Sequence, residues 1–244
     1  LITALVKEHC ETLETYSIGI KGGEDLKYSQ MVADFLGTKH TQIILTEADF
    51  LNAIPETIKA IESYDTTTVR ASVGNYLVSK YISKHSSAKI IFNGDGSDEV
   101  CGGYMYFQCA PNAIDFDIEC RRLLKDIHYF DVLRSDRSIS SNGLEARTPF
   151  LDKNFVFNYL SIPPNFRHHG GLKQCEKYLL RKAFEKENLL PSEVLWRKKE
   201  AFSDGVSSQK RSWYKVIQEY VQRPIIQKQI RHRSDSKEHN TPST

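Results

Sequence analysis

Alternating strand and helix patterns in the first 92 residues constrain the fold most strongly. Helical spacing of apolar residues is present at 31–36, where Gly37 is expected to end the helix, and at 51–61, where Pro55 must kink the helix or begin a new one. Three short segments have strand character: 16–20, 41–45 and 89–92. This order predicts an α/β fold, with a parallel sheet flanked by helices.

The second half of the chain has a different pattern. Ser72 is expected to cap a helix just before the third strand. From about Phe116 onward only helical periodicity is present, for example at Leu123, Ile127, Phe130 and Leu133, and again at Tyr178, Leu179 and Phe184. His168 and His169 lack the spacing and the third ligand of a metal site, which favours a surface loop. Trp196 and Trp213 are expected to be packing residues. We predict a helical second half.

Composition narrows the functional classes. The 244 residues carry a formal net charge of +2, with Lys and Arg spread along the chain, which disfavours nucleic acid and an acidic membrane surface as partners. No apolar run approaches the roughly 20 residues that span a bilayer, so no membrane association is expected. The five cysteines form no Cys-x-x-Cys pair and are odd in number, which disfavours zinc and a disulfide framework. We expect a cytoplasmic protein with a small anionic ligand.

The two ends of the sequence indicate its organisation. Apolar residues at 1, 2, 5 and 6 have helical spacing, so we expect the sequence to open inside an amphipathic helix that further sequence precedes. Residues 223–244 are polar and are predicted to be a loop or a disordered tail. We therefore expect one domain over residues 1–222, followed by this tail.

A glycine-rich acidic segment follows the third predicted strand. Residues 93–99 read Asn-Gly-Asp-Gly-Ser-Asp-Glu, and Gly102-Gly103-Tyr104 follows, which places four glycines and three carboxylates within eleven residues. Glycines at the carboxyl end of a strand let backbone N–H groups approach a phosphate or ribose. Mg²⁺ is usually held by one or two carboxylates together with phosphate oxygens. Asp98 is thus a candidate metal ligand, and Asp95 a candidate proton acceptor or orienting group. A solvated acidic turn is the alternative.

Three further segments accompany this loop in order. They are Tyr-Asp-Thr-Thr-Thr-Val-Arg-Ala-Ser at 64–72, Gly-Leu-Glu-Ala-Arg-Thr-Pro-Phe-Leu-Asp at 143–152, and Leu-Trp-Arg-Lys-Lys-Glu-Ala-Phe-Ser-Asp-Gly at 195–205. All four resemble the signatures of the C-terminal synthetase domain of glutamine-hydrolysing asparagine synthetases. The resemblance implies an ATP-pyrophosphatase fold, which is adenine nucleotide alpha hydrolase-like.

The resemblance also implies an ATP-dependent carbon–nitrogen ligase. ATP and Mg²⁺ would activate aspartate as β-aspartyl-AMP with release of pyrophosphate, and ammonia would then give asparagine and AMP. The ammonia would come from glutamine through an N-terminal glutaminase domain that these residues do not include. The family resemblance also allows a homodimer.

Roles for individual residues follow from the same resemblance. Asp95, Lys199 and Arg70 are the catalytic candidates. Ile18, Asn93, Gly94, Asp98, Thr67 and Thr68 are the ATP-binding candidates, with Asp98 also holding Mg²⁺. Gly103, Tyr104, Asp131 and Arg147 are candidates for substrate contact or support.

Four of these candidates can also be explained by an ordinary structural role with no part in a functional site. Lys199 would be an exposed charge at a helix end, and Ile18 plain core. The remaining two would be held locally: Arg70 by Asp65 or by a carboxylate at a helix start, and Arg147 by Asp152 or by a helix terminus.

The chain departs from the family pattern in several places. Asp95 stands where the family usually has Glu, Asn93 where it usually has Ser, and Cys101 where it has a bulky apolar residue. The phosphate-binding Ser-Gly-Gly-Leu-Asp-Ser signature is absent, so residues 1–244 alone are expected to be inactive. The alternatives are a related adenylating ligase such as a β-lactam synthetase, another ATP-pyrophosphatase ligase, and a catalytically dead binding module.

Overall fold

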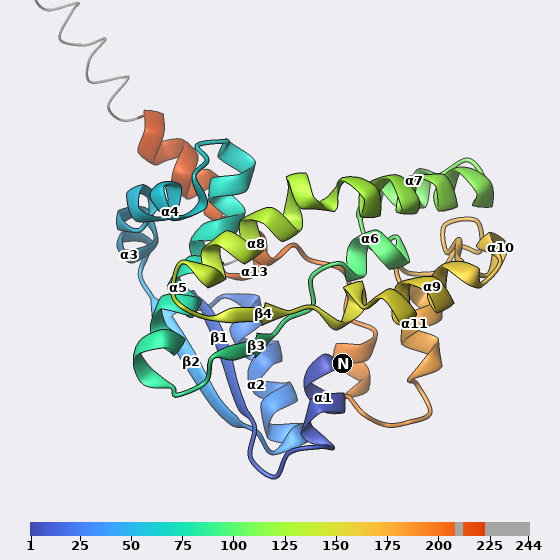
Figure 1. Cartoon of the computed structure of the whole chain (residues 1–244), viewed down its shortest axis with the longest axis horizontal. Coiled ribbons are helices and arrows are strands. Elements are labelled where there is room, and N and C mark those ends of the chain that lie inside the picture. The colour runs from blue at the N-terminus through green and yellow to red at the C-terminus, as the bar shows by residue number, and fades with distance from the viewer. Residues whose placement is uncertain (208–211, 223–244) are drawn as a thin grey trace, which may run out of the picture.

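The computed structural model describes residues 1–207 and 212–222 (Figure 1). The first half contains α1 (Ile2–Lys7), β1 (Glu14–Ile20), α2 (Glu24–Leu36), β2 (Lys39–Leu45), α3 (Glu47–Asn52), α4 (Ile54–Ile61), α5 (Thr66–His85), β3 (Ile90–Phe92), α6 (Ser97–Cys101) and the 3₁₀ helix η1 (Met105–Cys109). The second half contains α7 (Ala113–Asp126), η2 (Ile127–Tyr129), α8 (Asp131–Ser140), β4 (Glu145–Arg147), η3 (Pro149–Leu151), α9 (Lys153–Ser161), α10 (Pro164–Arg167), α11 (Tyr178–Ala183), α12 (Ser192–Leu195) and α13 (Phe202–Gly205), and residues 213–222 are helical. The tail predicted at 223–244 lies outside the described residues.

The strands form two small parallel sheets. β1 pairs with β2 in a register that places Ile18 beside Ile43, and β3 pairs with β4 with Ile91 beside Ala146. The parallel α/β class predicted from the sequence is therefore confirmed. β4 lies in a segment for which only helix was expected, because three residues with two exposed charged side chains carry no strand pattern. Its backbone pairing with β3 determines its conformation.

A cavity of about 490 Å³ separates the two sheets. Within the described residues, β1 is paired on its β2 side only and β3 on its β4 side only. Residues from both strands line the cavity together with residues of α1 and α5. The cavity therefore reaches the carboxyl end of β3, where the glycine-rich segment begins.

Local signals set the helix boundaries in the first half. Gly37 ends α2 in the left-handed region, with a φ of 64°, as predicted. Pro55 lies in the first turn of α4, so it begins a new helix after α3. The cap predicted at Ser72 is wrong: Asp65 caps α5 by accepting the Thr68 N–H at 2.8 Å, and the Ser72 hydroxyl donates to the Thr68 carbonyl in mid-helix. α5 thus begins seven residues earlier than expected, at a carboxylate cap.

The main core lies between α3, α4, α5, the β1–β2 sheet and the C-terminal helical segment. Phe50 and Trp213 are fully buried there, and their rings meet edge to face with centroids 5.4 Å apart. The indole N–H of Trp213 donates to the Arg70 carbonyl at 3.2 Å. Trp196 packs against Tyr178. Both tryptophans are packing residues, as predicted.

His168 and His169 lie in a loop, as predicted, but the expectation that this loop lies at the surface is wrong. These side chains are only 7% and 1% exposed, and both rings lie against Phe116 of α7. The segment folds back so closely that a Cβ on Gly170 would lie 2.9 Å from the Gln108 backbone carbonyl oxygen. The adjacent glycines therefore permit close packing.

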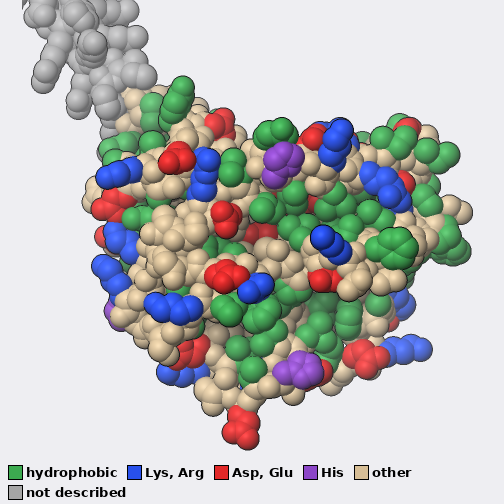
Figure 2. All heavy atoms as spheres, in the orientation of Figure 1, with side chains coloured by type: hydrophobic (Ala, Val, Ile, Leu, Met, Phe, Trp, Pro, Cys, Tyr) green, Lys and Arg blue, Asp and Glu red, His purple; other side chains and the backbone are tan. Residues whose placement is uncertain are grey.

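All five cysteines are free. Among the described helices, none is long and apolar enough to cross a bilayer. Figure 2 shows acidic and basic side chains interspersed over one face of the molecule.

Candidate active site

The glycine-rich segment turns the chain from β3 into α6. Gly96 has a φ of 86°, and a Cβ there would overlap the Leu151 side chain, so glycine is required for both reasons. A Cβ on Gly94 would meet no atom within 4 Å, so its surroundings are open. The turn places Asp98 and Glu99 in the first turn of α6, where acidic groups interact favourably with the helix dipole.

Asp98 lies between two lysines. Lys199 Nζ donates to Asp98 Oδ2 at 2.8 Å, and Lys177 Nζ lies 3.0 Å from Oδ1 and 2.9 Å from the Ser97 hydroxyl. Burial raises the pKa of the Asp98 carboxyl, but the two ammonium groups outweigh burial and hold this pKa below its usual range. Two cations and one carboxylate leave this cluster with a net positive charge.

Gly103 allows close contact within the cluster formed by Asp98, Lys177 and Lys199, which we call the Asp98 cluster. A Cβ on Gly103 would overlap both Asp98 and the end of the Lys177 side chain. Lys177 itself has a positive φ of 56°, a conformation that non-glycine residues rarely adopt. Lys177 was not among the predicted site residues, because it lies outside the four matched segments and its positive φ cannot be read from the sequence.

A second group of acids lies next to this cluster. The Tyr104 hydroxyl lies 2.5 Å from Glu99 Oε1 and 2.9 Å from Asp131 Oδ2, and Asp131 pairs with Arg134 one turn along α8. Burial raises the pKa of Glu99 to about 7, and the charge of Asp131 adds to this effect against the Tyr104 hydrogen bond. Burial together with Glu99 and Asp131 also raises the pKa of Tyr104. Lys199 lies over the Tyr104 ring, 5.8 Å from its centroid, which joins the two groups.

Asp95 faces α8. Its Oδ2 accepts a hydrogen bond from the Ser135 hydroxyl at 2.5 Å, and its backbone N–H donates to the Asn93 side chain at 3.2 Å. Burial raises the pKa of the Asp95 carboxyl; Ser135 and the Arg134 charge oppose this effect, and the Asp131 charge adds to it. The structure thus brings the loop carboxylate to the same helix that carries Asp131.

The cavity between the sheets collects four predicted ATP-binding or catalytic residues. Ile18 of β1 and Asn93, Gly94 and Asp95 after β3 all line it. Ile18 is only 2% exposed and also belongs to the main core. The alternative that Ile18 is a core residue therefore accounts for part of its role.

The predicted residues at the start of α5 have partners outside these clusters. The Thr68 hydroxyl donates to Asp65 Oδ1, and Thr67 is exposed in the first turn. The Arg70 guanidinium lies 5.6 Å from the centroid of the Tyr214 ring, and its buried Nε has no hydrogen-bond partner. The structure therefore does not bring these three residues into contact with Asp98 or Asp95.

Arg147 also has a local partner. Its guanidinium pairs with Glu145 at 2.7 Å, and both side chains are more than half exposed. The backbone carbonyl of Arg147 accepts the Asn93 N–H at 3.1 Å. The contacts of Arg147 thus support the glycine-rich segment through its backbone.

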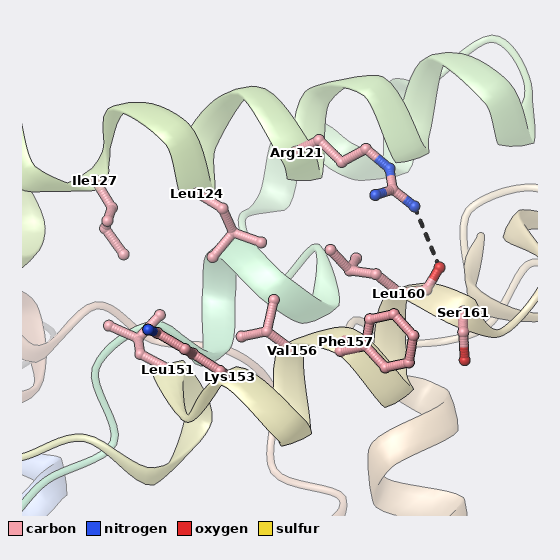
Figure 3. Close-up of a pocket in the computed structure, with 9 residues that line it drawn as sticks. All are labelled: Arg121, Leu124, Ile127, Leu151, Lys153, Val156, Phe157, Leu160 and Ser161. Atoms are coloured by element: carbon pink, nitrogen blue, oxygen red, sulfur yellow. Dashed lines mark hydrogen bonds between the residues drawn. The ribbon is translucent and has the colours of Figure 1, made fainter.

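A separate hollow of about 590 Å³ lies between α7 and α9 (Figure 3). It is mainly apolar, and Arg121 on its rim donates to the Leu160 carbonyl at 3.2 Å. Its lining contains none of the predicted site residues: Arg121, Leu124, Ile127, Leu151, Lys153, Val156, Phe157, Leu160 and Ser161. The charged side chains that converge in the Asp98 cluster and in the neighbouring group of acids therefore identify the candidate active site better than the volume of a cavity does.

The sequence was compared with known protein families. The family described as asparagine synthase matches residues 1–117 and 111–237. Asparagine synthetase (glutamine-hydrolyzing) from Homo sapiens is 46% identical over 233 residues, which is 95% of this chain and 41% of the human protein. The proteins of the same name from Gallus gallus and Bos taurus are 45% and 43% identical over the same shares.

The chain thus spans less than half the length of these curated relatives. The family match nevertheless covers more than half of the chain, including the glycine-rich segment and Lys199. The chain belongs to the asparagine synthase family and has its adenine nucleotide alpha hydrolase-like fold.

Proposed function

We propose that the protein to which this chain belongs makes asparagine from aspartate, ATP and ammonia, with glutamine as the ammonia source. The β-carboxylate of aspartate attacks the α-phosphorus of ATP, which forms β-aspartyl-AMP and releases pyrophosphate. Ammonia then attacks the acyl carbon, and AMP leaves with the former carboxylate oxygen. The observation that carries this proposal is the partly buried Asp98 carboxylate held between Lys177 and Lys199.

The two lysines suit the release of pyrophosphate. Their ammonium groups lie within 3.0 Å of one carboxylate in a partly buried site, so both are preorganised where an anion is to be stabilised. Donors aimed at developing charge in such a site are typically worth about 3 kcal/mol each in the transition state. Phosphate oxygens would take over the interactions that Asp98 makes with the lysines.

Asp98 also fits a shared magnesium site. Its Oδ1 is buried and is contacted by the Lys177 ammonium group at 3.0 Å, so a metal ion bound to this oxygen would take the place of that ammonium group. No group of three or more metal-ligating side chains occurs in the described part of the chain, so the ion would bind together with nucleotide phosphates. When bound, Mg²⁺ would neutralise phosphate charge next to Lys177 and Lys199.

The acid groups suit the aspartate and ammonia half of the reaction. Asp95 lines the cavity with a carboxyl whose pKa burial raises, so it would orient the reacting groups during adenylation and later accept the proton that the attacking nitrogen must lose. A raised pKa brings a carboxylate closer to the neutral range in which a general base works well. Tyr104 and Asp131 would orient the substrate's ammonium group from the opposite side of the loop. Arg70, Thr67, Thr68 and Arg147 remain candidates whose role would require contacts with bound substrate.

We further propose that residues 1–244 alone do not form the adenylate. The Ser-Gly-Gly-Leu-Asp-Ser motif does not occur in them, and the cavity between β1 and β3 lies beside the nucleotide-binding candidates. The rest of the protein would supply the missing phosphate contacts and the glutaminase activity. A cytoplasmic location is the proposed setting, in agreement with the five free cysteines.

Exchange of labelled pyrophosphate into ATP tests this function. We expect the full-length protein to catalyse exchange that requires aspartate and Mg²⁺, and the isolated 1–244 chain to show none above background. Exchange that glutamate or a β-amino acid supports as well as aspartate does would contradict the substrate assignment. Aspartate-dependent exchange by the isolated chain would contradict its proposed inactivity while supporting the chemistry.

A further inference from the structure

Ser135 connects two residues of the glycine-rich segment. Its hydroxyl donates to Asp95 Oδ2 at 2.5 Å and accepts a hydrogen bond from the Asn93 side-chain amide at 3.4 Å. The side-chain oxygen of Asn93, Oδ1, in turn accepts the Asp95 backbone N–H at 3.2 Å. The three residues therefore form a closed ring of hydrogen bonds. Asn93 and Asp95 are also two of the positions at which the sequence departs from the family pattern.

The chemistry of a hydroxyl group fixes the direction of these bonds. Serine has one O–H proton to donate and two lone pairs to accept. Because the Asn93 amide occupies an acceptor position, the single Ser135 proton is directed to Asp95. A bond from a neutral hydroxyl to a carboxylate is among the stronger hydrogen bonds in proteins. The ring thus holds Asp95 in one orientation.

Ser135 is well placed to hold Asp95 in a fixed position. The side chain is 4% exposed, and it lies on α8, which Arg137 ties to the Ile61 carbonyl at 2.7 Å. Asp95 is held through Oδ2 by the Ser135 hydroxyl. Asp95 also lines the cavity between the sheets. Ser135 therefore anchors one carboxylate oxygen of Asp95 at the edge of a cavity that a substrate can enter.

We propose that Ser135 is a positioning residue for the adenylation and amidation site, which holds the short Asp95 side chain in its working place while Asn93 orients the Ser135 hydroxyl. The proposal rests on the proposed function, because it gives Asp95 a catalytic task. Ser135 acts through Asp95 and does not itself contact substrate. Asp95 has one methylene fewer than the glutamate usual in the family. The serine on the facing helix compensates for this shorter side chain.

Substitution of Ser135 in the full-length protein tests the proposal. We expect Ser135→Ala to lower the rate of aspartate-dependent ATP–pyrophosphate exchange about 10- to 100-fold with the KM for ATP within about threefold, because a misplacement of about 1 Å can cost about 10²-fold. Ser138→Ala is the matched control, since Ser138 is a fully buried serine one turn along α8 whose hydroxyl donates to the Arg134 carbonyl. This control should retain exchange within about threefold of the wild-type rate.

A second substitution separates positioning from general loss of structure. In the Ser135→Ala background, Asp95→Glu should restore exchange to within about threefold of wild type, because the longer side chain regains reach where the hydroxyl is gone. Asp95→Glu alone should lower exchange, because the longer carboxylate then competes with Ser135 for space. Equal losses in Ser135→Ala and Ser138→Ala, or a double variant no better than Ser135→Ala, would overturn the proposal.

A spectroscopic readout keeps the inference separate from the proposed function. The ¹³C carboxyl resonance of Asp95, assigned by its loss in Asp95→Asn, should shift at pH 7.5 in Ser135→Ala and not in Ser138→Ala. An unmoved resonance would overturn the contact whatever the activity. A shifted resonance in a full-length protein that shows no exchange would instead refute the proposed function, and with it the catalytic meaning of the contact.

Discussion

Replacement of Lys199 by methionine is expected to lower aspartate-dependent ATP–pyrophosphate exchange by about 10²- to 10³-fold. The ammonium group of Lys199 lies 2.8 Å from Asp98 Oδ2 in a partly buried site, so it is preorganised for the charge that develops on pyrophosphate. Loss of one such donor typically costs about 10²- to 10³-fold in rate. Methionine retains most of the apolar stem and removes only the charge.

The adjacent residue provides the control for this substitution. Lys198 is exposed, whereas Lys199 is not, so Lys198→Met removes one positive charge without touching the Asp98 cluster and should leave exchange within about twofold. Rates and KM values for ATP and aspartate would be measured for both variants in the full-length protein. A rate for Lys199→Met close to that of Lys198→Met would show that Lys199 is merely a charge at the surface of the site.

Glu99 is expected to make the stability of the chain depend on pH in an unusual direction. Its pKa is raised from an ordinary value of 4.5 to about 7 by burial, and by the charge of Asp131 against the Tyr104 hydrogen bond. The folded state therefore binds more protons than the unfolded state between these two values. The contribution of Glu99 to the stability of the folded state is fully present below about pH 4.5 and is lost as the pH rises through about 7.

Substitution of Glu99 by glutamine should remove this dependence. Glutamine keeps an acceptor for the Tyr104 hydroxyl but carries no charge, so the variant should gain stability over wild type as the pH rises from 5 to 8. The gain has an upper limit of about 3 kcal/mol, because one pKa unit corresponds to about 1.4 kcal/mol. Urea unfolding of the wild-type and variant chains at both pH values measures it.

Glu14 offers a control of opposite sign. Hydrogen bonds from Lys39, Ser86 and Tyr16 lower its pKa to about 2, so this carboxylate is ionised throughout the range from pH 5 to 8 in the folded state. The difference between Glu14→Gln and wild type should therefore stay nearly constant over that range. A Glu99→Gln difference that is equally constant would show that Glu99 is not protonated in the folded chain near neutral pH.

Local patterns predicted much of the first half of the fold. The strand patterns at 16–20 and 41–45, the stop at Gly37 and the restart at Pro55 all act within a few residues, so they are legible in the sequence. β4 is different, because Glu145 to Arg147 become a strand only through pairing with β3. The cap of α5 was misplaced because Ser72 and Asp65 are both good capping residues, so the residue types alone do not distinguish them.

The candidate site was only partly visible for similar reasons. Asp95, Asp98 and Tyr104 lie in one dense motif, and Lys199 lies in a matched segment. Lys177 reaches Asp98 across 79 residues of sequence and Ser135 reaches Asp95 across 40, and no local pattern marks such long-range contacts. The same limit explains why His168 and His169, which pack on Phe116, were expected at the surface.

Transfer of oxygen from aspartate to AMP tests the central claim most directly. The full-length protein would be supplied with ATP, Mg²⁺, ammonia and aspartate carrying ¹⁸O in its β-carboxylate, and the AMP would be analysed by mass spectrometry. Formation of β-aspartyl-AMP predicts one ¹⁸O atom in each AMP formed with asparagine. Unlabelled AMP, or ADP with ¹⁸O in inorganic phosphate, would contradict the account, because the carboxylate would then not have been activated at the α-phosphorus.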